Sequence, residues 1–138
     1  MSEIALPKID NSILERKNDI IKKLSKLTNS DNVLSEAEEL RPYETDALSV
    51  YTQTPLAVVL PENTNEVSDI LKFCNKENIK VVPRGAGTGL SGGALPLQDA
   101  ILLGLGKFNK ILEIDYDNKC VVTQPGVTNL GITHAVEH

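Results

Sequence analysis

A run of glycines between residues 85 and 93 is the part of the chain best suited to bind a ligand. Five of the nine glycines lie within it, directly after the apolar run 79–82. Glycine has no Cβ and adopts positive φ, so a dense cluster lets successive backbone N–H groups point toward one anion. Thr88 and Ser91 can add hydroxyl donors, and Arg84 can add a positive charge. The run predicts a phosphate-binding loop, and a tight turn without ligand is the alternative.

The glycine spacing does not fit either of two common phosphate-binding motifs. A Walker loop ends in Gly-Lys-Ser/Thr, and no lysine occurs in this loop or in the ten residues after it. The dinucleotide pattern G-x-G-x-x-G is present at residues 87–92, with Glu113 near the position of a ribose-binding acid. Such a loop must open a helix, whereas Pro96 and the apolar run 100–103 follow here. The loop is therefore predicted to join two strands.

The wider pattern resembles the FAD-binding domain of the vanillyl-alcohol oxidase/p-cresol methylhydroxylase (PCMH) superfamily. Three stretches carry the resemblance: the run from Val82 to Ala94, the upstream Pro61 with Glu66-Val67, and the downstream Gln124-Pro125-Gly126-Val127. Within this superfamily the chain is most similar to the flavin subunit of glycolate oxidase and to the related D-lactate dehydrogenases. The resemblance covers roughly residues 41–138.

The resemblance implies an oxidoreductase with FAD as cofactor, which oxidises a D-2-hydroxy acid such as glycolate or D-lactate by hydride transfer to flavin N5. It also implies partner subunits of a glycolate oxidase complex. Family members are several times longer, so the catalytic base and the substrate site are expected outside this chain, which alone should bind FAD weakly and show no turnover. The cofactor-binding residues that the resemblance assigns are Pro83, Arg84, Gly85, Ala86, Gly87, Thr88, Gly89, Leu90, Ser91, Gly92, Gly93, Pro125, Gly126 and Val127.

A second hypothesis remains open from the residues themselves. The chain could be a non-catalytic module that binds a phosphate or nucleotide, or that pairs with another subunit. Without the resemblance, Pro125-Gly126 is an ordinary turn. His134 and His138 have no carboxylate or cysteine at ligand spacing, so neither a metal site nor a catalytic residue is predicted.

Composition argues against several other classes of protein. The 138 residues carry a net charge of −5 that is spread evenly, so no basic face for nucleic acid is predicted. The apolar runs are far shorter than the ~18 residues of a membrane span. The N-terminus lacks a secretory signal, which favours a cytoplasmic location. Cys74 and Cys120 are predicted to be buried thiols rather than a disulfide.

The elements that must position the loop follow from hydrophobic periodicity. The apolar run 56–60 is typical of a strand covered on both faces. Asn63 or Thr64 can cap a helix that ends at Asn78, and a strand at 79–82 follows. These elements predict a βαβ unit of an α/β (α+β) fold, with parallel strands and with the glycine loop at the carboxyl end of the second strand.

Further strands and a helix are predicted after the loop. Asp115 to Asn118 supply turn chemistry for a hairpin, because Asp and Asn bond their own backbone. Thr128 or Asn129 can cap the last helix. The predicted strands are 101–103, 110–114 and 120–123.

Residues 1–53 are predicted to form a helical and irregular lead-in, and residues 54–138 to form the N-terminal part of the FAD-binding domain, incomplete at its C-terminus. A capping box at Ser12 and Glu15 predicts the first helix, and a shorter helix is expected from Ser35.

Pro42 should end any helix and favour an extended conformation at Arg41. The segment from there to Thr54 is expected to be irregular. Asp46 is expected to fix a turn, and neither it nor Tyr43 is assigned a role in chemistry.

Overall fold

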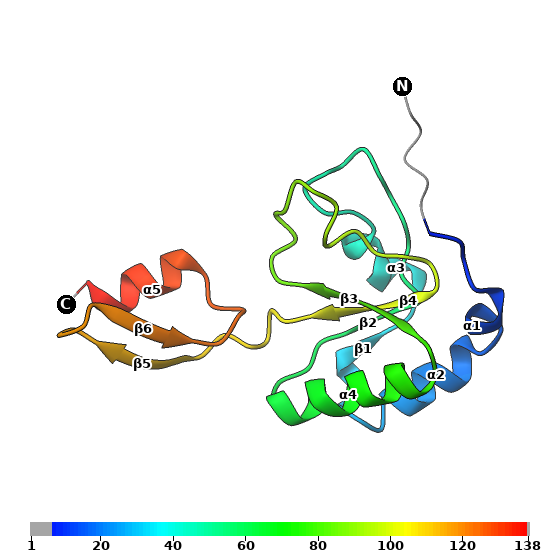
Figure 1. Cartoon of the computed structure of the whole chain (residues 1–138), viewed down its shortest axis with the longest axis horizontal. Coiled ribbons are helices and arrows are strands. Elements are labelled where there is room, and N and C mark those ends of the chain that lie inside the picture. Colours follow the sequence, from blue (N-terminus) through cyan, green and yellow to red (C-terminus); the bar gives the residue numbers. More distant parts are fainter. Residues whose placement is uncertain (1–6, 138) are drawn as a thin grey trace.

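Residues 7–137 are described by a computed structural model, in which the chain forms two lobes joined by a narrow connection (Figure 1). The larger lobe contains a four-stranded sheet with helices on both faces. The smaller lobe contains a two-stranded sheet and the last helix. The predicted mixed α/β class is confirmed, because a βαβ unit is followed by further strands.

The sheet of the larger lobe consists of β1 (Val33–Leu34), β2 (Ala57–Val59), β3 (Lys80–Arg84) and β4 (Ala100–Gly104). Their order is β1-β2-β4-β3, with β1 antiparallel to β2 and the other three strands parallel. The two strands of the predicted βαβ unit are therefore parallel, but β4 lies between them. The edge strand β1 escapes prediction because two residues carry no periodicity.

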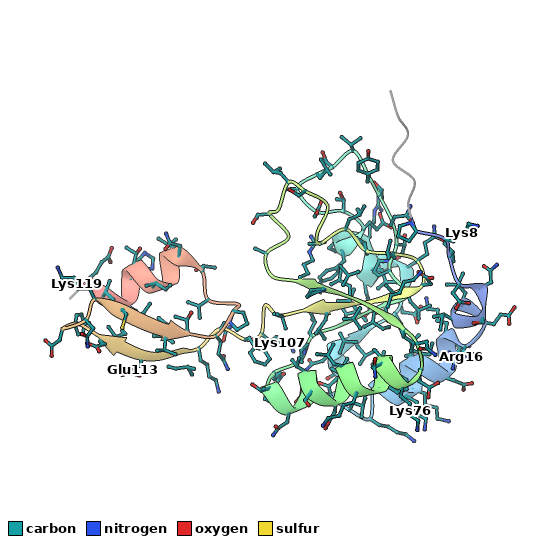
Figure 2. The ribbon with its side chains drawn as sticks, viewed as in Figure 1. Lys8, Arg16, Lys76, Lys107, Glu113 and Lys119 are labelled. Atoms are coloured by element: carbon teal, nitrogen blue, oxygen red, sulfur yellow. The ribbon has the colours of Figure 1, made fainter. Side chains whose placement is uncertain are left out.

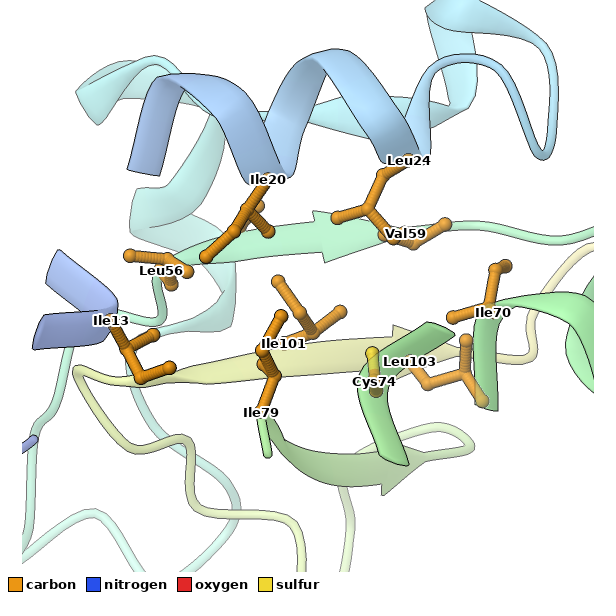
Figure 3. Packing of buried hydrophobic residues seen from close by; sticks show 11 residues of the cluster. Ile13, Ile20, Leu24, Leu56, Val59, Ile70, Cys74, Ile79, Ile101 and Leu103 are labelled. Carbon is orange, nitrogen blue, oxygen red and sulfur yellow. The ribbon is translucent and has the colours of Figure 1, made fainter. Parts of the chain in front are cut away.

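Helices cover both faces of this sheet (Figure 1). On the first face, Leu24 points toward Val59 of β2, and Ile20 lies beside Leu56 (Figure 3). On the opposite face, Leu40 packs with Val58 and Leu102. Each fully buried Leu or Ile side chain contributes about 1.5–3 kcal/mol. The first face is covered by α1 (Asn11–Glu15), α2 (Lys17–Leu24) and α4 (Thr64–Lys76), and the opposite face by α3 (Ala37–Leu40).

Polar side chains fix the ends of α4 as the sequence predicts. Asn63 is the N-cap, and its side-chain oxygen accepts a hydrogen bond of 3.0 Å from the backbone N–H of Glu66. At the other end, Asn78 has a φ of 55° and directs the chain into β3. Asn tolerates this left-handed conformation better than most residues. The helix of the βαβ unit is thus set by its local sequence.

The starts of the first helices differ from the prediction. Asp10, rather than Ser12, is the first N-cap, and its carboxylate accepts hydrogen bonds from the backbone N–H and the hydroxyl of Ser12. The N-cap of α3 is Glu36, one residue beyond Ser35, and Glu39 completes its capping box. A carboxylate reaches the free N–H groups as a serine hydroxyl does, so the choice between neighbouring caps is not fixed by residue type.

Two short 3-10 turns, η1 (Ser30–Asn32) and η2 (Arg41–Tyr43), precede β1 and follow α3. The expected extended conformation of Arg41 is wrong, because Arg41 has helical angles (φ −53°, ψ −40°). Pro42 is tolerated there, since the N–H that proline lacks has no acceptor in the first turn of a helix.

The core joins residues from both sides of the division proposed at residue 54. Ile13, Ile20 and Leu24 belong to one buried cluster with Val59 and Leu103. The lead-in helices therefore supply one cover of the sheet. The division into residues 1–53 and 54–138 stays a prediction.

The smaller lobe consists of β5 (Ile111–Asp115), β6 (Cys120–Thr123) and α5 (Asn129–Val136). Asp115 accepts a hydrogen bond of 2.9 Å from the backbone N–H of Asn118, which confirms the predicted hairpin turn. Thr128 caps α5 by accepting from Gly131. None of the residues described in these three elements is buried. The prediction of a buried Cys120 is wrong, because Cys120 and Val122, which alternate along β6, are both exposed.

Candidate functional site

The glycine loop leaves the carboxyl end of β3 and returns to β4 through Pro96 and Asp99. It opens no helix, which confirms the predicted connection from strand to strand. Because β3 and β4 are parallel, the loop after β3 and the connection after β4 leave the same edge of the sheet. That edge faces the smaller lobe (Figure 1).

The backbone N–H groups of residues 85–94 are available for a ligand. None of them donates a hydrogen bond to another residue of the described range 7–137. The side chains of Thr88, Leu90 and Ser91 are exposed as well. A segment with so many unpaired donors at one edge of a sheet is suited to hold an anion such as a pyrophosphate.

At only two positions of this loop does the backbone conformation itself require glycine. Gly87 and Gly92 have φ of 72° and 73°, which side chains rarely adopt. At Gly85, Gly89 and Gly93 the φ values are ordinary, and a Cβ placed there would have no atom within 4 Å. Space therefore lies open against the backbone at these three positions. A ligand group that approaches the main chain closely, such as a pyrophosphate, fits this arrangement.

Arg84 turns back toward the lead-in. Its Nη1 donates to the carbonyl oxygens of Thr45 (2.7 Å) and Tyr43 (3.4 Å), and its guanidinium carbon lies 5.7 Å from the centroid of the Tyr43 ring. A Cβ on Gly87 would lie 2.5 Å from Arg84 Nε. The positive charge of Arg84 thus lies between Gly87 of the glycine loop and residues 43–45. Whether Arg84 also contacts phosphate stays a prediction.

The second predicted segment, residues 125–127, joins β6 to α5 in the smaller lobe and lies against residues 105–108, which connect the lobes. The N–H of Gly126 donates to the carbonyl oxygen of Phe108 at 2.7 Å, and a Cβ on Gly126 would lie 2.7 Å from the same oxygen. Glycine is therefore required at 126 by contact with the chain after β4. Val127 and neighbouring residues line a hollow of about 570 Å³.

Backbone hydrogen bonds tie the two predicted segments to the same edge of the sheet. The N–H of Leu105 donates to the carbonyl oxygen of Arg84 (2.9 Å), and the N–H of Phe108 donates to that of Leu105 (2.9 Å). Phe108 in turn accepts from Gly126. The structure thus connects the start of the glycine loop to residues 125–127 through residues 105–108.

Residues 106–109 lie at this edge but were not predicted as site residues. Gly106 and Asn109 line the same hollow as Val127. Lys107, near the connection in Figure 2, donates to the buried amide oxygen of Asn32 and lies 3.3 Å from Glu62. The side-chain hydrogen bond from Asn32, followed by that from Lys107, lowers the pKa of the Glu62 carboxyl. The only sequence signal here was a Gly-Lys-Phe-Asn run between two predicted strands.

Groups that could support other chemistry are sparse in the described part of the chain. Residues 7–137 contain no cluster of three or more His, Cys, Asp or Glu side chains that could hold a metal. His138 lies outside these residues. Cys74 is buried, and burial raises the pKa of its thiol to about 11. No helix in this range is both long and apolar enough for a bilayer crossing. The cytoplasmic location stays a prediction.

Comparison with known proteins identifies the family. Residues 55–138 match the model of the FAD binding domain family. The glycolate oxidase subunit GlcD of Escherichia coli is 49% identical over 104 residues, which are 75% of this chain and 21% of that protein. A D-lactate dehydrogenase of Archaeoglobus fulgidus is 51% identical over 71 residues, or 51% of this chain and 16% of that protein.

The fold has solved counterparts. The structure of p-cresol methylhydroxylase with bound substrate has a TM-score of 0.77 and 28% sequence identity, and the match covers 97% of this chain and 26% of that one. The chain spans about a fifth of the length of the curated relatives that it matches. The fold is that of PCMH-type proteins, and FAD, the predicted cofactor, is confirmed as the ligand of the matched domain. The glycine loop and its surroundings thus lie within a domain of known type, and the chain belongs to the FAD binding domain family.

Proposed function

We propose that the chain supplies the pyrophosphate-binding wall of the FAD site in an oxidoreductase that oxidises a D-2-hydroxy acid such as glycolate or D-lactate. The observation that carries this proposal is the glycine loop itself. Its backbone N–H groups have no acceptor in residues 7–137, and the space beside Gly85, Gly89 and Gly93 is open.

The loop acts through hydrogen bonds to negative charge. Each hydrogen bond between a backbone N–H and a phosphate oxygen contributes about 1.5–3 kcal/mol, because the acceptor is charged. The missing Cβ atoms let the pyrophosphate reach these donors. Thr88 and Ser91 are exposed beside them and can donate from their hydroxyl groups.

The second wall is residues 125–127 with the hollow beside Val127, which would hold the flavin portion against the connection between the lobes. FAD held there would supply the electron-accepting centre, with N5 as the acceptor of the hydride from the hydroxy acid. The residues of this chain bind and orient that cofactor. The catalytic base and the substrate site are proposed to belong to the remainder of a longer protein.

The substrate class and partners rest on the relatives. One is named a glycolate oxidase subunit and another a D-lactate dehydrogenase. Both names specify small 2-hydroxy acids. Subunits of a glycolate oxidase complex are the proposed protein partners, in line with the word subunit in the first name.

Reconstitution of the full-length protein with FAD tests the proposal. After removal of unbound cofactor, flavin absorbance near one equivalent per chain is expected, and it should be bleached by glycolate or D-lactate in the absence of oxygen. A protein that retains no flavin would contradict the FAD site. Retained flavin that neither acid bleaches would contradict glycolate and D-lactate as substrates, without contradicting the FAD site.

A further inference from the structure

The turn of residues 43–48 contacts the glycine loop at its start and in its middle. At the start, Arg84 donates from Nη1 to the carbonyl oxygen of Thr45 at 2.7 Å. In the middle, the backbone N–H of Ala47 donates to the carbonyl oxygen of Gly87 at 2.9 Å. Both bonds join segments about forty residues apart. The second is a main-chain bond to a glycine in the left-handed conformation.

The same turn also reaches the end of the loop. A Cβ placed on Gly92 would lie 3.7 Å from Leu48 Cδ2. The position of Leu48 is set by Asp46, whose Oδ1 accepts the backbone N–H of Leu48 at 2.9 Å. Asp46 is 5% exposed, and its Oδ2 has no hydrogen-bond partner among the described residues. A buried carboxylate therefore holds the part of the turn that faces Gly92.

Hydrogen bonds within the lead-in hold this turn in one conformation. Thr45 donates from its hydroxyl to the carbonyl oxygen of Tyr51 at 3.0 Å, and the N–H of Gln53 donates to that of Glu44 at 2.8 Å. The loop, by contrast, has five glycines and no donated backbone hydrogen bonds from residues 85–94. Among the described residues, the loop backbone accepts two hydrogen bonds, a local one from Leu95 to Gly92 and a distant one from Ala47 to Gly87. The turn therefore supplies the backbone bond that joins the loop to a distant segment.

We propose that the turn of residues 43–48 presets the glycine loop in its FAD-binding shape, and that Asp46 and Ala47 are positioning residues for the cofactor. This inference rests on the proposed function for the identity of the ligand. A loop that is ordered before binding loses less conformational entropy when the pyrophosphate arrives, so affinity increases without any contact between the turn and FAD. The turn thus acts on binding through the loop alone.

Backbone order of the loop glycines tests the mechanism in the 138-residue chain. We expect NMR order parameters above about 0.8 at Gly87 and Gly89 in the original sequence, and below about 0.6 in Asp46→Ala and in Ala47→Pro, which lacks the donor to Gly87. Ser49→Pro is the matched control, because Ser49 N donates no hydrogen bond among the described residues and occupies the second position of the 48–51 turn, where proline is favoured. Val58 in β2 should stay rigid in every variant.

Cofactor affinity in the full-length protein tests the consequence. Asp46→Ala should weaken FAD binding at least tenfold, and Asp46→Asn should restore it, because the amide oxygen still accepts the N–H of Leu48. If Asp46→Ala fails to fold, Leu48→Ala provides the same comparison from the Gly92 side. Loop order parameters and FAD affinity that are unchanged in these variants would overturn the inference. A full-length protein that binds no FAD would overturn the proposed function instead, while the order parameters would still decide whether the turn shapes the loop.

Discussion

At the scale of single residues, glycine serves three purposes in this chain. Gly87 and Gly92 adopt a left-handed conformation, and Gly126 allows close contact with carbonyl oxygens after β4. At Gly85, Gly89 and Gly93 neither the φ angle nor a close contact requires glycine, and the absence of a side chain leaves open space beside the backbone. The sequence shows that glycines are concentrated here but does not separate these purposes, because φ and neighbouring atoms depend on distant segments. Gly89 is the position where a side chain should affect the ligand without affecting the fold.

The variant Gly89→Val should weaken FAD binding by the full-length protein at least 100-fold, equivalent to about 2.8 kcal/mol. The added side chain would enter the open space proposed for the pyrophosphate, while the melting temperature should change by less than about 2 °C. Isothermal titration with FAD and a thermal melt measure both quantities. Lys76→Val, on the exposed side of α4 (Figure 2), is the control for an added valine. Unchanged affinity in Gly89→Val would refute the placement of the pyrophosphate.

The two cysteines should differ in reactivity. Cys74 is 1% exposed and burial raises the pKa of its thiol to about 11, whereas Cys120 lies exposed on β6. The thiolate is the reactive form, so a disulfide reagent at pH 8 should modify Cys120 at least ~100 times faster than Cys74. Cys120→Ser should remove the fast phase, and Cys74→Ser should leave it intact. Two thiols of equal rate in the folded chain would contradict the burial of Cys74.

At the scale of elements, local signals predicted α4, the β5-β6 hairpin and the cap of α5, because the determining residues lie within a few positions of one another. The position of β4 between β2 and β3 could not be predicted, since strand order depends on packing between distant segments. The contact between the turn at residues 43–48 and the glycine loop could not be predicted for the same reason. Every residue has a backbone carbonyl, so a hydrogen bond to one does not require a particular residue type and cannot be recognised in the sequence.

An ion pair at the opposite edge of the sheet should make stability depend on pH. Asp99 is 2% exposed and accepts from Lys80 Nζ (2.6 Å) and from the backbone N–H of Asp10 (2.7 Å). Burial opposes ionisation of Asp99, but the hydrogen bonds from Lys80 and Asp10 outweigh it and lower the pKa of the carboxyl below its ordinary 3.8. The ionised group therefore stabilises the fold fully above about pH 5, and this stabilisation is lost as the pH falls through the folded-state pKa.

Urea unfolding of Asp99→Ala at pH 7 should show a loss of about 1–3 kcal/mol, because two donors lose their acceptor. Asp99→Asn keeps an acceptor for Asp10 and should reduce the drop in stability between pH 5 and 3 that the original sequence shows. Asp69→Asn is the control, since Asp69 belongs to an exposed pair with Lys72, which is worth less than about 1 kcal/mol. An identical pH profile in Asp99→Asn would contradict this role of Asp99.

At the scale of the whole molecule, the two lobes differ in how well they cover their apolar residues. The larger lobe contains the buried clusters, whereas Leu112, Val122 and Leu130 of the smaller lobe are 61%, 47% and 63% exposed. A hollow of about 410 Å³ lies between its hairpin and α5. Exposed apolar surface on this scale favours association with another surface.

The isolated 138-residue chain should therefore self-associate and bind FAD weakly, with a dissociation constant above about 10 μM. A dinucleotide needs most of its surface buried for tight binding, and this chain supplies only two segments of the proposed site, the glycine loop and residues 125–127. Sedimentation velocity over a range of concentrations, combined with calorimetric titration, measures both properties. Leu130→Lys should reduce the association without changing the FAD affinity. A monodisperse monomer with submicromolar affinity would contradict this prediction.

Amide NMR of the isolated chain with Leu130→Lys, which reduces self-association, can show during a titration with FAD whether residues 85–93 bind the pyrophosphate. Weak binding suits the method, and each N–H group is observed separately. We expect the backbone N–H signals of residues 85–93 to shift downfield together and to saturate, while those of β2 stay in place. Riboflavin, which lacks the pyrophosphate, should leave residues 85–93 unchanged. Saturable binding of FAD that leaves the signals of residues 85–93 unmoved would contradict the claim that this loop holds the pyrophosphate.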